Sequence, residues 1–328
     1  MQTKNLRLFL ILICFFGGGH VFGQQKMRLN TGWEFIKQDL GGIWEAIRPE
    51  EKGVPPDLPH WEKVTLPHCF NARDAVDPDI NYYQGPGWYR TQLNINNPYS
   101  GGRVLLHFEG AGQKSDVYVY DTKVGSHVGG YDEWTVDITK AVEDFKKTAV
   151  CQKQFKGNVP VEIRCDNSRD LESIPSRLSD FTVYGGIYRY LNLVYTPPVS
   201  LDKVFAKAEV DKQGKQGSIN VSVRVYDPEN IKSAEGDIRI IDPLGKVVQQ
   251  SKYSLSTTAG DLPVGSFKIK KPELWSPDRP ALYTVEVTVR ANGGTFTQSE
   301  KIGFRNFEFV DHGPFMFHGK RLLLRGTH

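Results

Sequence analysis

The stretch Tyr283–Gly294 reads YTVEVTVRANGG, and its alternation decides the fold class. Tyr283 and every second residue up to Val289 are apolar, whereas Thr284, Glu286 and Thr288 lie between them and Arg290 follows. A side-chain period of two places the apolar set on one face of a β-strand. Asn292, Gly293 and Gly294 then follow, and these residue types accept the positive φ of a tight turn. We therefore predict a strand with one buried face, closed by a turn.

The same alternation recurs along most of the chain. Clear cases are GRVLLHFEGAG at residues 102–112, DVYVY at 116–120 and SINVSVRVYD at 218–227. No stretch of a dozen residues has a convincing helical period of 3.6, and the best helical candidate, ITKAVEDFKK at 138–147, is short. The sequence predicts an all-β protein of the sandwich type.

Two consecutive prolines, Pro197 and Pro198, mark a predicted domain boundary. Proline donates no backbone hydrogen bond and restricts the residue before it, which suits a connection between two sheets. A length of 328 residues also fits two cores. We expect a first sandwich that ends at residue 198, a second over residues 199–305, and a protease-sensitive linker at residues 195–199.

The N-terminus resembles a secretory signal peptide in its charge and hydropathy. Lys4 and Arg7 precede the apolar run Leu8–Phe16, and Gly23 supplies a small residue before Gln24. The apolar run is too short to span a bilayer. We predict cleavage of residues 1–23, secretion or export to the periplasm, and no membrane association of the mature chain.

Charge and cysteine content exclude two further classes of protein. The formal net charge is only +3, and no cluster of Lys and Arg is interleaved with aromatic residues, so nucleic acid is not an expected partner. Cys69, Cys151 and Cys165 remain after signal cleavage, without a C-x-x-C spacing. A disulfide framework is not expected. Cys165 reads as a buried apolar residue, and pairing of Cys151 with Cys165 stays open.

Local catalytic motifs are missing from the chain. It has no G-x-S-x-G, H-E-x-x-H, Walker or dinucleotide-binding pattern. Its histidines have no metal-ligand spacing, so we predict neither a metal site nor a cofactor in this chain.

Aromatic residues are the informative class. NYYQGPGWYR at residues 81–90 combines four aromatic rings with glycines and a proline, a composition that can present rings for stacking on a sugar. Trp88 and Tyr89 begin a strand and are expected in the core. Tyr83 and Gln84 are the better candidates for substrate binding.

Five stretches taken together resemble the N-terminal half of glycoside hydrolase family 2, of the β-galactosidase/β-glucuronidase type. In chain order they are WEKVTLPHCFN (61–71), QGPGWYRTQL (84–93), LSDFTVYGGIYRYLNLV (178–194), PELWSPDRPALYTVEV (272–287) and IGFRNFEF with GKRLLLRGTH (302–328). The resemblance implies a jelly-roll, galactose-binding-like sugar-binding domain over residues 24–198. An immunoglobulin-like sandwich over 199–305 and a short stub of a (β/α)8 catalytic barrel over 306–328 would follow.

The resemblance also assigns roles to single residues. Asp180 matches a jelly-roll aspartate that binds sugar hydroxyls, directly or through a sodium ion; its alternative is a turn residue that accepts backbone N–H groups. Gln84 stands where some β-galactosidases carry a substrate-contacting asparagine. Arg325 and His328 match residues that line the pocket at the barrel entry. Three residues are expected to be structural: Gly185, Gly186 and Arg189.

Both catalytic glutamates of the family would lie beyond the stretch that this chain matches, so no catalytic residue is assigned and the chain alone is predicted to be inactive. We interpret it as a truncated gene product, a split reading frame or a fragment that lacks its catalytic barrel. Magnesium or sodium is implied only for complete enzymes, and the chain could form homo-oligomers.

Two functions follow from these observations. The first is the N-terminal portion of a retaining β-galactosidase-like hydrolase that acts on β-linked glycans, with a β-galactoside-containing carbohydrate as its partner. The alternative is a free-standing carbohydrate-binding module without hydrolase activity. Apolar residues after Arg305 would lack a packing partner in a free module, which favours the first reading.

Overall fold

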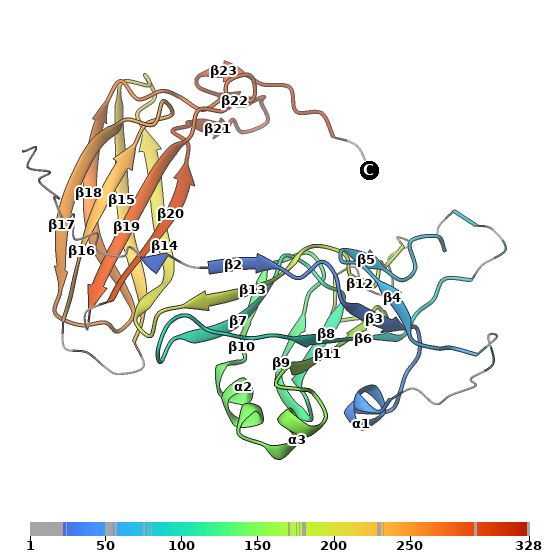
Figure 1. Ribbon diagram of the computed structural model, residues 1–328. Coiled ribbons are helices and arrows are strands. Elements are labelled where there is room, and N and C mark those ends of the chain that lie inside the picture. The colour runs from blue at the N-terminus through green and yellow to red at the C-terminus, as the bar shows by residue number, and fades with distance from the viewer. Residues whose placement is uncertain are drawn as a thin grey trace, which may run out of the picture.

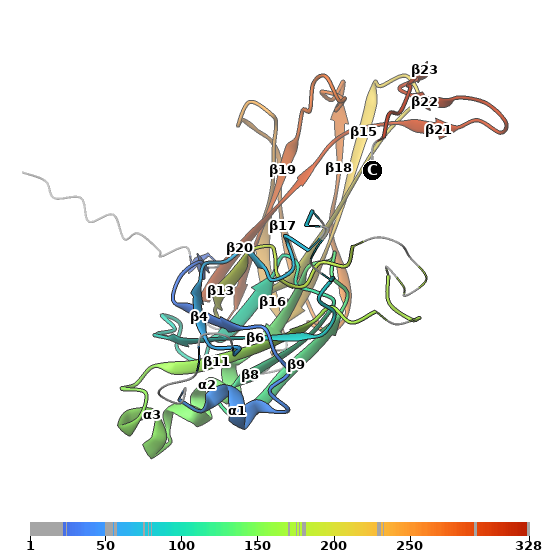
Figure 2. The same cartoon turned by 90° about the vertical axis from the view of Figure 1, so that its right-hand side faces the viewer.

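The computed structural model describes residues 22–23, 25–49, 55, 58–74, 76–77, 79, 81–169, 171–174, 176, 178, 182–227, 231, 233–291 and 294–326. Two β-sandwiches are joined end to face, and a small sheet stands at the far end of the second one (Figures 1 and 2). The predicted all-β fold class, a jelly-roll domain followed by an immunoglobulin-like domain, is confirmed.

The first sandwich is built from two antiparallel sheets. The larger has the order β4-β3-β6-β11-β8-β9, and the smaller has the order β10-β7-β13-β2. The strands of the larger sheet are β3 (Trp33–Ile36), β4 (Glu62–Val64), β6 (Pro86–Leu93), β8 (Lys114–Val119), β9 (Thr122–Val128) and β11 (Val159–Asp166). Those of the smaller are β2 (Gln25–Arg28), β7 (Arg103–Phe108), β10 (Trp134–Asp137) and β13 (Leu191–Thr196). A short pair, β5 (His68–Cys69) with β12 (Gly186–Ile187), closes one end.

The core of the first sandwich follows from the alternation. Ile163 on β11 lies opposite Tyr89 on β6 and Val117 on β8, and none of the three is exposed. Leu106 and Leu193 contribute from the smaller sheet. Trp88 points to the other side of the larger sheet but is also buried, in a small cluster with Ile36 and Ala46. The predicted burial of Trp88 and Tyr89 is confirmed.

The second sandwich pairs a sheet of order β1-β20-β19-β16-β17 with one of order β14-β15-β18. Their bounds are β1 (Phe22–Gly23), β14 (Ser200–Val210), β15 (Gln216–Tyr226), β16 (Ala234–Ile241), β17 (Val247–Leu255), β18 (Asp261–Lys270), β19 (Tyr283–Ala291) and β20 (Gly294–Ile302). The strand expected from YTVEVTVRANGG is β19, whose Val285 and Val287 are fully buried. Asn292 and Gly293 of the predicted turn lie outside the described residues.

Three helices accompany the first sandwich. The predicted helical candidate forms α2 (Thr139–Lys146), which buries Val142 and Phe145. Helices α1 (Ile43–Ile47) and α3 (Ala149–Lys153) were not predicted, because five residues are too few to display a helical period. No described helix is long and apolar enough to cross a membrane.

The segment at residues 195–199, predicted to be a protease-sensitive linker, is largely buried. Tyr195 and Thr196 belong to β13 and are buried, and Val199 and Ser200 after the two prolines are buried as well. Tyr195 packs into the core of the first sandwich and Val199 into the core of the second. The two prolines lie between the end of β13 and the start of β14.

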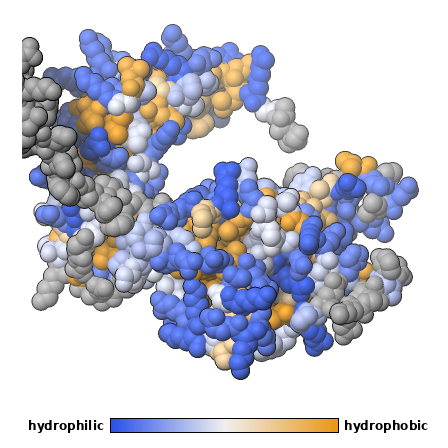
Figure 3. Space-filling view, in the orientation of Figure 1, coloured by the Kyte–Doolittle hydropathy of each residue, from blue (hydrophilic) through white to orange (hydrophobic). Residues whose placement is uncertain are grey.

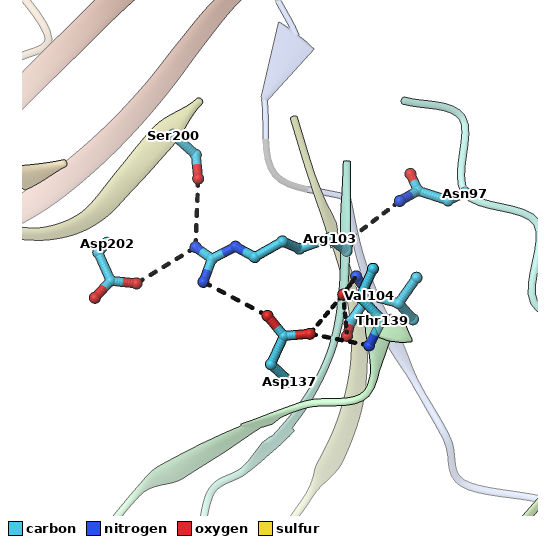
Figure 4. A network of polar contacts seen from close by, with 7 residues as sticks. All are labelled: Asn97, Arg103, Val104, Asp137, Thr139, Ser200 and Asp202. Atoms are coloured by element: carbon cyan, nitrogen blue, oxygen red, sulfur yellow. Dashed lines mark hydrogen bonds and ion pairs between the residues drawn. The ribbon is translucent and has the colours of Figure 1, made fainter. Parts of the chain in front are cut away.

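Arg103 holds this contact (Figure 4). Its Nη2 donates to Ser200 Oγ and to Asp202 Oδ1 of the second sandwich, each at 3.4 Å. Its guanidinium lies 3.3 Å from the ring centroid of Tyr226, and Nη1 lies 4.0 Å from Asp137 Oδ2 of the first sandwich. One side chain therefore links β7 and β10 to β14 and β15.

The residues after the second sandwich form a three-stranded antiparallel sheet of β21 (Phe307–Phe309), β22 (Phe315–Phe317) and β23 (Lys320–Arg321). His318 Nε2 lies 3.0 Å from Trp275 O, and Phe317 contacts the Trp275 ring. Phe309 and Leu324 are nevertheless 76% and 67% exposed. Figure 3 shows apolar residues along this projecting arm.

The cysteines are free in the structure. Cys151 and Cys165 are buried, and Cys69 is partly exposed, so no disulfide links Cys151 to Cys165. The reading of Cys165 as a buried apolar residue is confirmed. Most of the predicted signal peptide, residues 1–21, lies outside the described residues, whereas Phe22–Gly23 pairs in parallel with β20.

Candidate functional site

Several of the sequence-predicted binding residues lie at one end of the first sandwich, beside β5 and β12. We call this place the loop edge and define it as residues 70–74, 81–86 and 182–188. The exposed residues Tyr82, Gln84 and Tyr184 belong to it. Thr182 Oγ1 donates to Tyr82 Oη at 3.2 Å, which ties two of its loops together.

Two buried asparagines hold the loop edge in shape. Asn71 Nδ2 donates to the Val183 carbonyl at 2.8 Å, and its Oδ1 accepts the Gly185 N–H at 2.9 Å. Asn167 Nδ2 donates to the carbonyls of Tyr83 at 2.8 Å and Val183 at 3.0 Å. Its Oδ1 accepts the Gly85 N–H at 2.9 Å. These bonds replace the ladder hydrogen bonds that irregular loops lack.

The polar groups of Tyr83 hydrogen-bond within the loop edge. Its hydroxyl donates to the Pro86 carbonyl at 2.7 Å, and its N–H donates to Asp74 Oδ2 at 2.8 Å. The ring is half-buried against Phe70, and this burial raises the pKa of the Tyr83 hydroxyl. Gln84 beside it is exposed, so its amide is available for hydrogen bonding to a ligand.

A packed floor lies beneath these loops. His68 Nδ1 lies 2.9 Å from Tyr89 Oη, and burial lowers the pKa of His68, which keeps the ring neutral at pH 7. Gly186 has a φ of 114°, and a Cβ on it would lie 2.5 Å from Tyr89 Oη and 2.6 Å from the His68 carbonyl. A Cβ on Gly185 would lie 2.2 Å from the Phe70 ring. The structural role predicted for both glycines is confirmed.

Three other site residues were predicted from the sequence. Two of them, Asp180 and His328, lie outside the described residues. Arg325 is exposed in the segment after β23, which turns back toward the first sandwich in Figures 1 and 2. Within the described part of the chain, Arg325 makes no hydrogen bond to the loop edge.

The described residues contain no group of three His, Cys, Asp or Glu side chains that could hold a metal ion. Asp74 is buried and accepts the Tyr83 N–H, so it orders a loop. The exposed groups of the loop edge are aromatic rings, an amide and hydroxyls, which can stack on and hydrogen-bond to a sugar.

Sequence reasoning missed Asn71 and Asn167. Both are polar residues at the ends of strand-like stretches, where an exposed turn residue is the ordinary expectation. Asn71 ends the WEKVTLPHCFN stretch that carried the family resemblance, and that position was the available signal.

A jelly-roll sandwich with an ordered loop edge, followed by an immunoglobulin-like sandwich, matches the two domains that the family resemblance implies. Sequence models of "Glycosyl hydrolases family 2, sugar binding domain" and "Glycosyl hydrolases family 2" match residues 49–197 and 199–305, respectively. The chain belongs to glycoside hydrolase family 2.

Known proteins show the same relationship over nearly the whole chain. A putative β-glucuronidase of Formosa agariphila is 32% identical over 98% of this chain and 36% of its own length. A β-galactosidase of Thermoanaerobacter pseudethanolicus is 28% identical over 93% and 38%, respectively. The crystal structure of a Parabacteroides merdae β-glucuronidase is 54% identical, with a TM-score of 0.87, over 93% of this chain and 39% of that chain. The chain thus spans less than half the length of these relatives.

Proposed function

We propose that this chain is the N-terminal part of a secreted or periplasmic retaining glycoside hydrolase that acts on β-linked glycans. In this role the two sandwiches supply a scaffold, and the loop edge supplies part of the sugar pocket. The observation that carries the proposal is the 54% identity to a β-glucuronidase structure across 93% of the chain.

A β-glucuronide is the first candidate substrate. The relative with 54% identity is a β-glucuronidase, and so is a Bacteroides uniformis structure at the same identity with a TM-score of 0.82. A β-galactoside is the second candidate, because the resemblance around Asp180 and the Arg325–His328 ending points to β-galactosidases. The Thermoanaerobacter relative supports this second candidate.

The division of labour follows from the chemistry of retaining glycosidases. Such enzymes place two carboxyl groups about 5–5.5 Å apart, one as nucleophile and one as acid/base. The described carboxylates beside Tyr83 are engaged elsewhere: Asp74 holds a backbone N–H, and Asp166 accepts from Arg164 at 2.9 Å. We infer that the loop edge binds sugar hydroxyls and that the two carboxyl groups belong to the catalytic barrel of the complete protein.

The experiment compares the isolated chain with the complete protein encoded at its locus. On nitrophenyl β-glucuronide and nitrophenyl β-galactoside, the isolated chain is expected to release no nitrophenol above the buffer blank. The complete protein is expected to prefer the glucuronide. Gln84→Ala in the complete protein should raise KM by about three- to tenfold, the loss of roughly one hydrogen bond.

Gln249→Ala is the matched control, because Gln249 is an exposed glutamine on β17 of the second sandwich. It should leave KM unchanged. Hydrolysis by the isolated chain would contradict the proposal, and a complete protein that binds glycans without cleaving either substrate would favour the carbohydrate-binding module.

A further inference from the structure

A pocket of about 1100 Å³ lies on the outer face of the larger sheet of the first sandwich, and none of its lining residues belongs to the loop edge. Strands β3, β6 and β11 form its floor. One wall is α1 with Arg48 and Pro49, and the other is Tyr120 with Gln154 and Phe155. Figure 1 shows α1 and α3 on this side of the sheet. We call it the α1 pocket; ligand pockets typically measure about 300–1,000 Å³, so it has room for more than one sugar ring.

Glu162 is the unusual residue of the floor. It lies on β11, between Arg90 on β6 and Tyr118 on β8, and is only 2% exposed. Its Oε2 is buried and has no hydrogen-bond partner among the described residues. Burial raises the pKa of Glu162 well above its ordinary value of 4.5. A buried carboxyl oxygen without a partner is costly, and a ligand hydroxyl in the pocket would supply the missing bond.

Arg90 fixes the wall beside Glu162. Its Nε donates to Glu34 Oε2 at 2.7 Å, and its Nη1 donates to the carbonyls of Arg48 at 3.0 Å and Ala46 at 3.3 Å. The guanidinium also lies 3.9 Å from the ring centroid of Trp61. Arg90 therefore holds the end of α1 against the sheet, and its charge is balanced by Glu34.

Trp44 supplies an aromatic surface at the rim. It is part of α1, is 59% exposed, and meets Tyr120 edge-on at a centroid distance of 6.0 Å. An exposed indole beside buried hydrogen-bonding groups suits the apolar face and the hydroxyls of a sugar ring. The amides of Gln92 and Gln154 extend the polar lining.

We propose that the α1 pocket binds a neutral oligosaccharide, with one sugar ring against Trp44 and a hydroxyl hydrogen-bonded to Glu162. A neutral ligand is favoured because both arginines that line the pocket are already paired, Arg90 with Glu34 and Arg48 with Glu45. This inference concerns binding only. It does not depend on hydrolysis and would survive failure of the proposed function.

The test measures binding to the full 328-residue chain by isothermal titration calorimetry. The probes are the neutral tetrasaccharides cellotetraose, xylotetraose and β-1,4-mannotetraose, with tetragalacturonate as the charged comparison. At least one neutral probe should bind, and Trp44→Ala should weaken it about tenfold or more, which corresponds to about 1.4 kcal/mol. Glu162→Leu should weaken it similarly, whereas Glu162→Gln, which keeps a carbonyl acceptor and an N–H donor, should change it less than about threefold.

Tyr131→Ala is the matched control, because Tyr131 is an aromatic residue that is 65% exposed and does not line the pocket. Circular dichroism should show that every variant is folded; Trp44→Ala removes only an exposed side chain, so it keeps the test valid if Glu162→Leu unfolds. The proposal is overturned if no neutral probe binds or if tetragalacturonate binds more tightly. It is also overturned if Tyr82→Ala abolishes binding while Trp44→Ala does not, which would place the ligand at the loop edge.

Discussion

At the scale of single residues, Glu162 gives the protein a pH-dependent stability. Its pKa is raised in the folded state, because burial penalises the charged form and Arg90 offsets this only in part. A carboxyl group with a raised folded pKa stabilises the fold below its unfolded value of about 4.5 and loses that contribution as pH rises.

Replacement of Glu162 by Gln should therefore stabilise the chain at neutral pH. We expect Glu162→Gln to increase the free energy of unfolding at pH 7, because the neutral amide is buried without the cost of burying a charge. The gain should vanish near pH 4. Urea titrations at both pH values measure it, with Glu308→Gln, on an exposed strand, as the control. An equal gain at both pH values would count against this account of Glu162.

The thiols should differ in reactivity. Burial raises the pKa of Cys165 to about 12 and also raises the pKa of the partly exposed Cys69. Thiolates are the reactive form, so Cys165 and the buried Cys151 should resist iodoacetamide in the native chain at pH 8. Cys69 should react slowly, and all three should react in urea. Peptide mass spectrometry reads out each site, and native labelling of Cys165 would disprove its burial.

At the scale of elements, the arm of β21–β23 is the part most prone to self-association. Its Phe307, Phe309, Leu323 and Leu324 are all more than half exposed and lie on short strands or next to them. Neighbouring exposed apolar residues mark a contact surface. Deletion of residues 306–328 should raise the monomer fraction in size-exclusion chromatography at micromolar concentration.

The double substitution of Phe307 and Phe309 by Ser should act in the same direction while keeping the chain length. Leu244→Ser is the control, because Leu244 is 85% exposed but lies alone in the turn between β16 and β17. If the deletion and the double substitution both left the elution volume unchanged, the arm would not be the associating surface.

The strands could be predicted from the sequence wherever one face is buried and the other faces solvent, as in β15 and β19. Short elements could not: α1 and α3 have only five residues each, and their positions depend on packing against the larger sheet. Glu162 shows the same limit within a strand. Alternation correctly puts it on the face opposite Ile163, but the burial of that face by α1 is a tertiary effect.

The candidate site was likewise predictable only in part from the sequence. The sequence predicts Gln84 as a candidate binding residue, and the structure leaves its side chain exposed at the loop edge. It could not separate Tyr83, whose hydroxyl is used by Pro86, from the more exposed Tyr82. The α1 pocket was not foreseen at all, because Trp44, Arg90 and Glu162 are far apart in the chain.

At the scale of the whole molecule, Arg103 couples the two sandwiches. Its side chain is 11% exposed and contacts Ser200, Asp202 and Tyr226 across the interface. Arg103→Ala should lower the free energy of unfolding by about 1–3 kcal/mol, because the buried Ser200 loses a hydrogen bond and the contact with Tyr226 is lost. Differential scanning calorimetry should then resolve two transitions instead of one.

Arg239→Ala provides the comparison for Arg103. Arg239 forms an ion pair with Glu286 at 2.7 Å on the surface of the second sandwich, where such pairs contribute little. It should shift the melting temperature by no more than about 1–2 °C and should keep one transition. Two transitions already present in the unmodified chain would show that the sandwiches unfold independently.

The buried junction at residues 195–200 also determines where domains of this protein can be exchanged with those of a relative. A cut after Pro198 would follow the boundary visible in the sequence, yet it would separate Arg103 from its acceptors Ser200 and Asp202. Chimeras that exchange only the first sandwich with a relative would need a compatible surface on the second. The pair of sandwiches, rather than either one, is the natural unit for exchange between homologous genes.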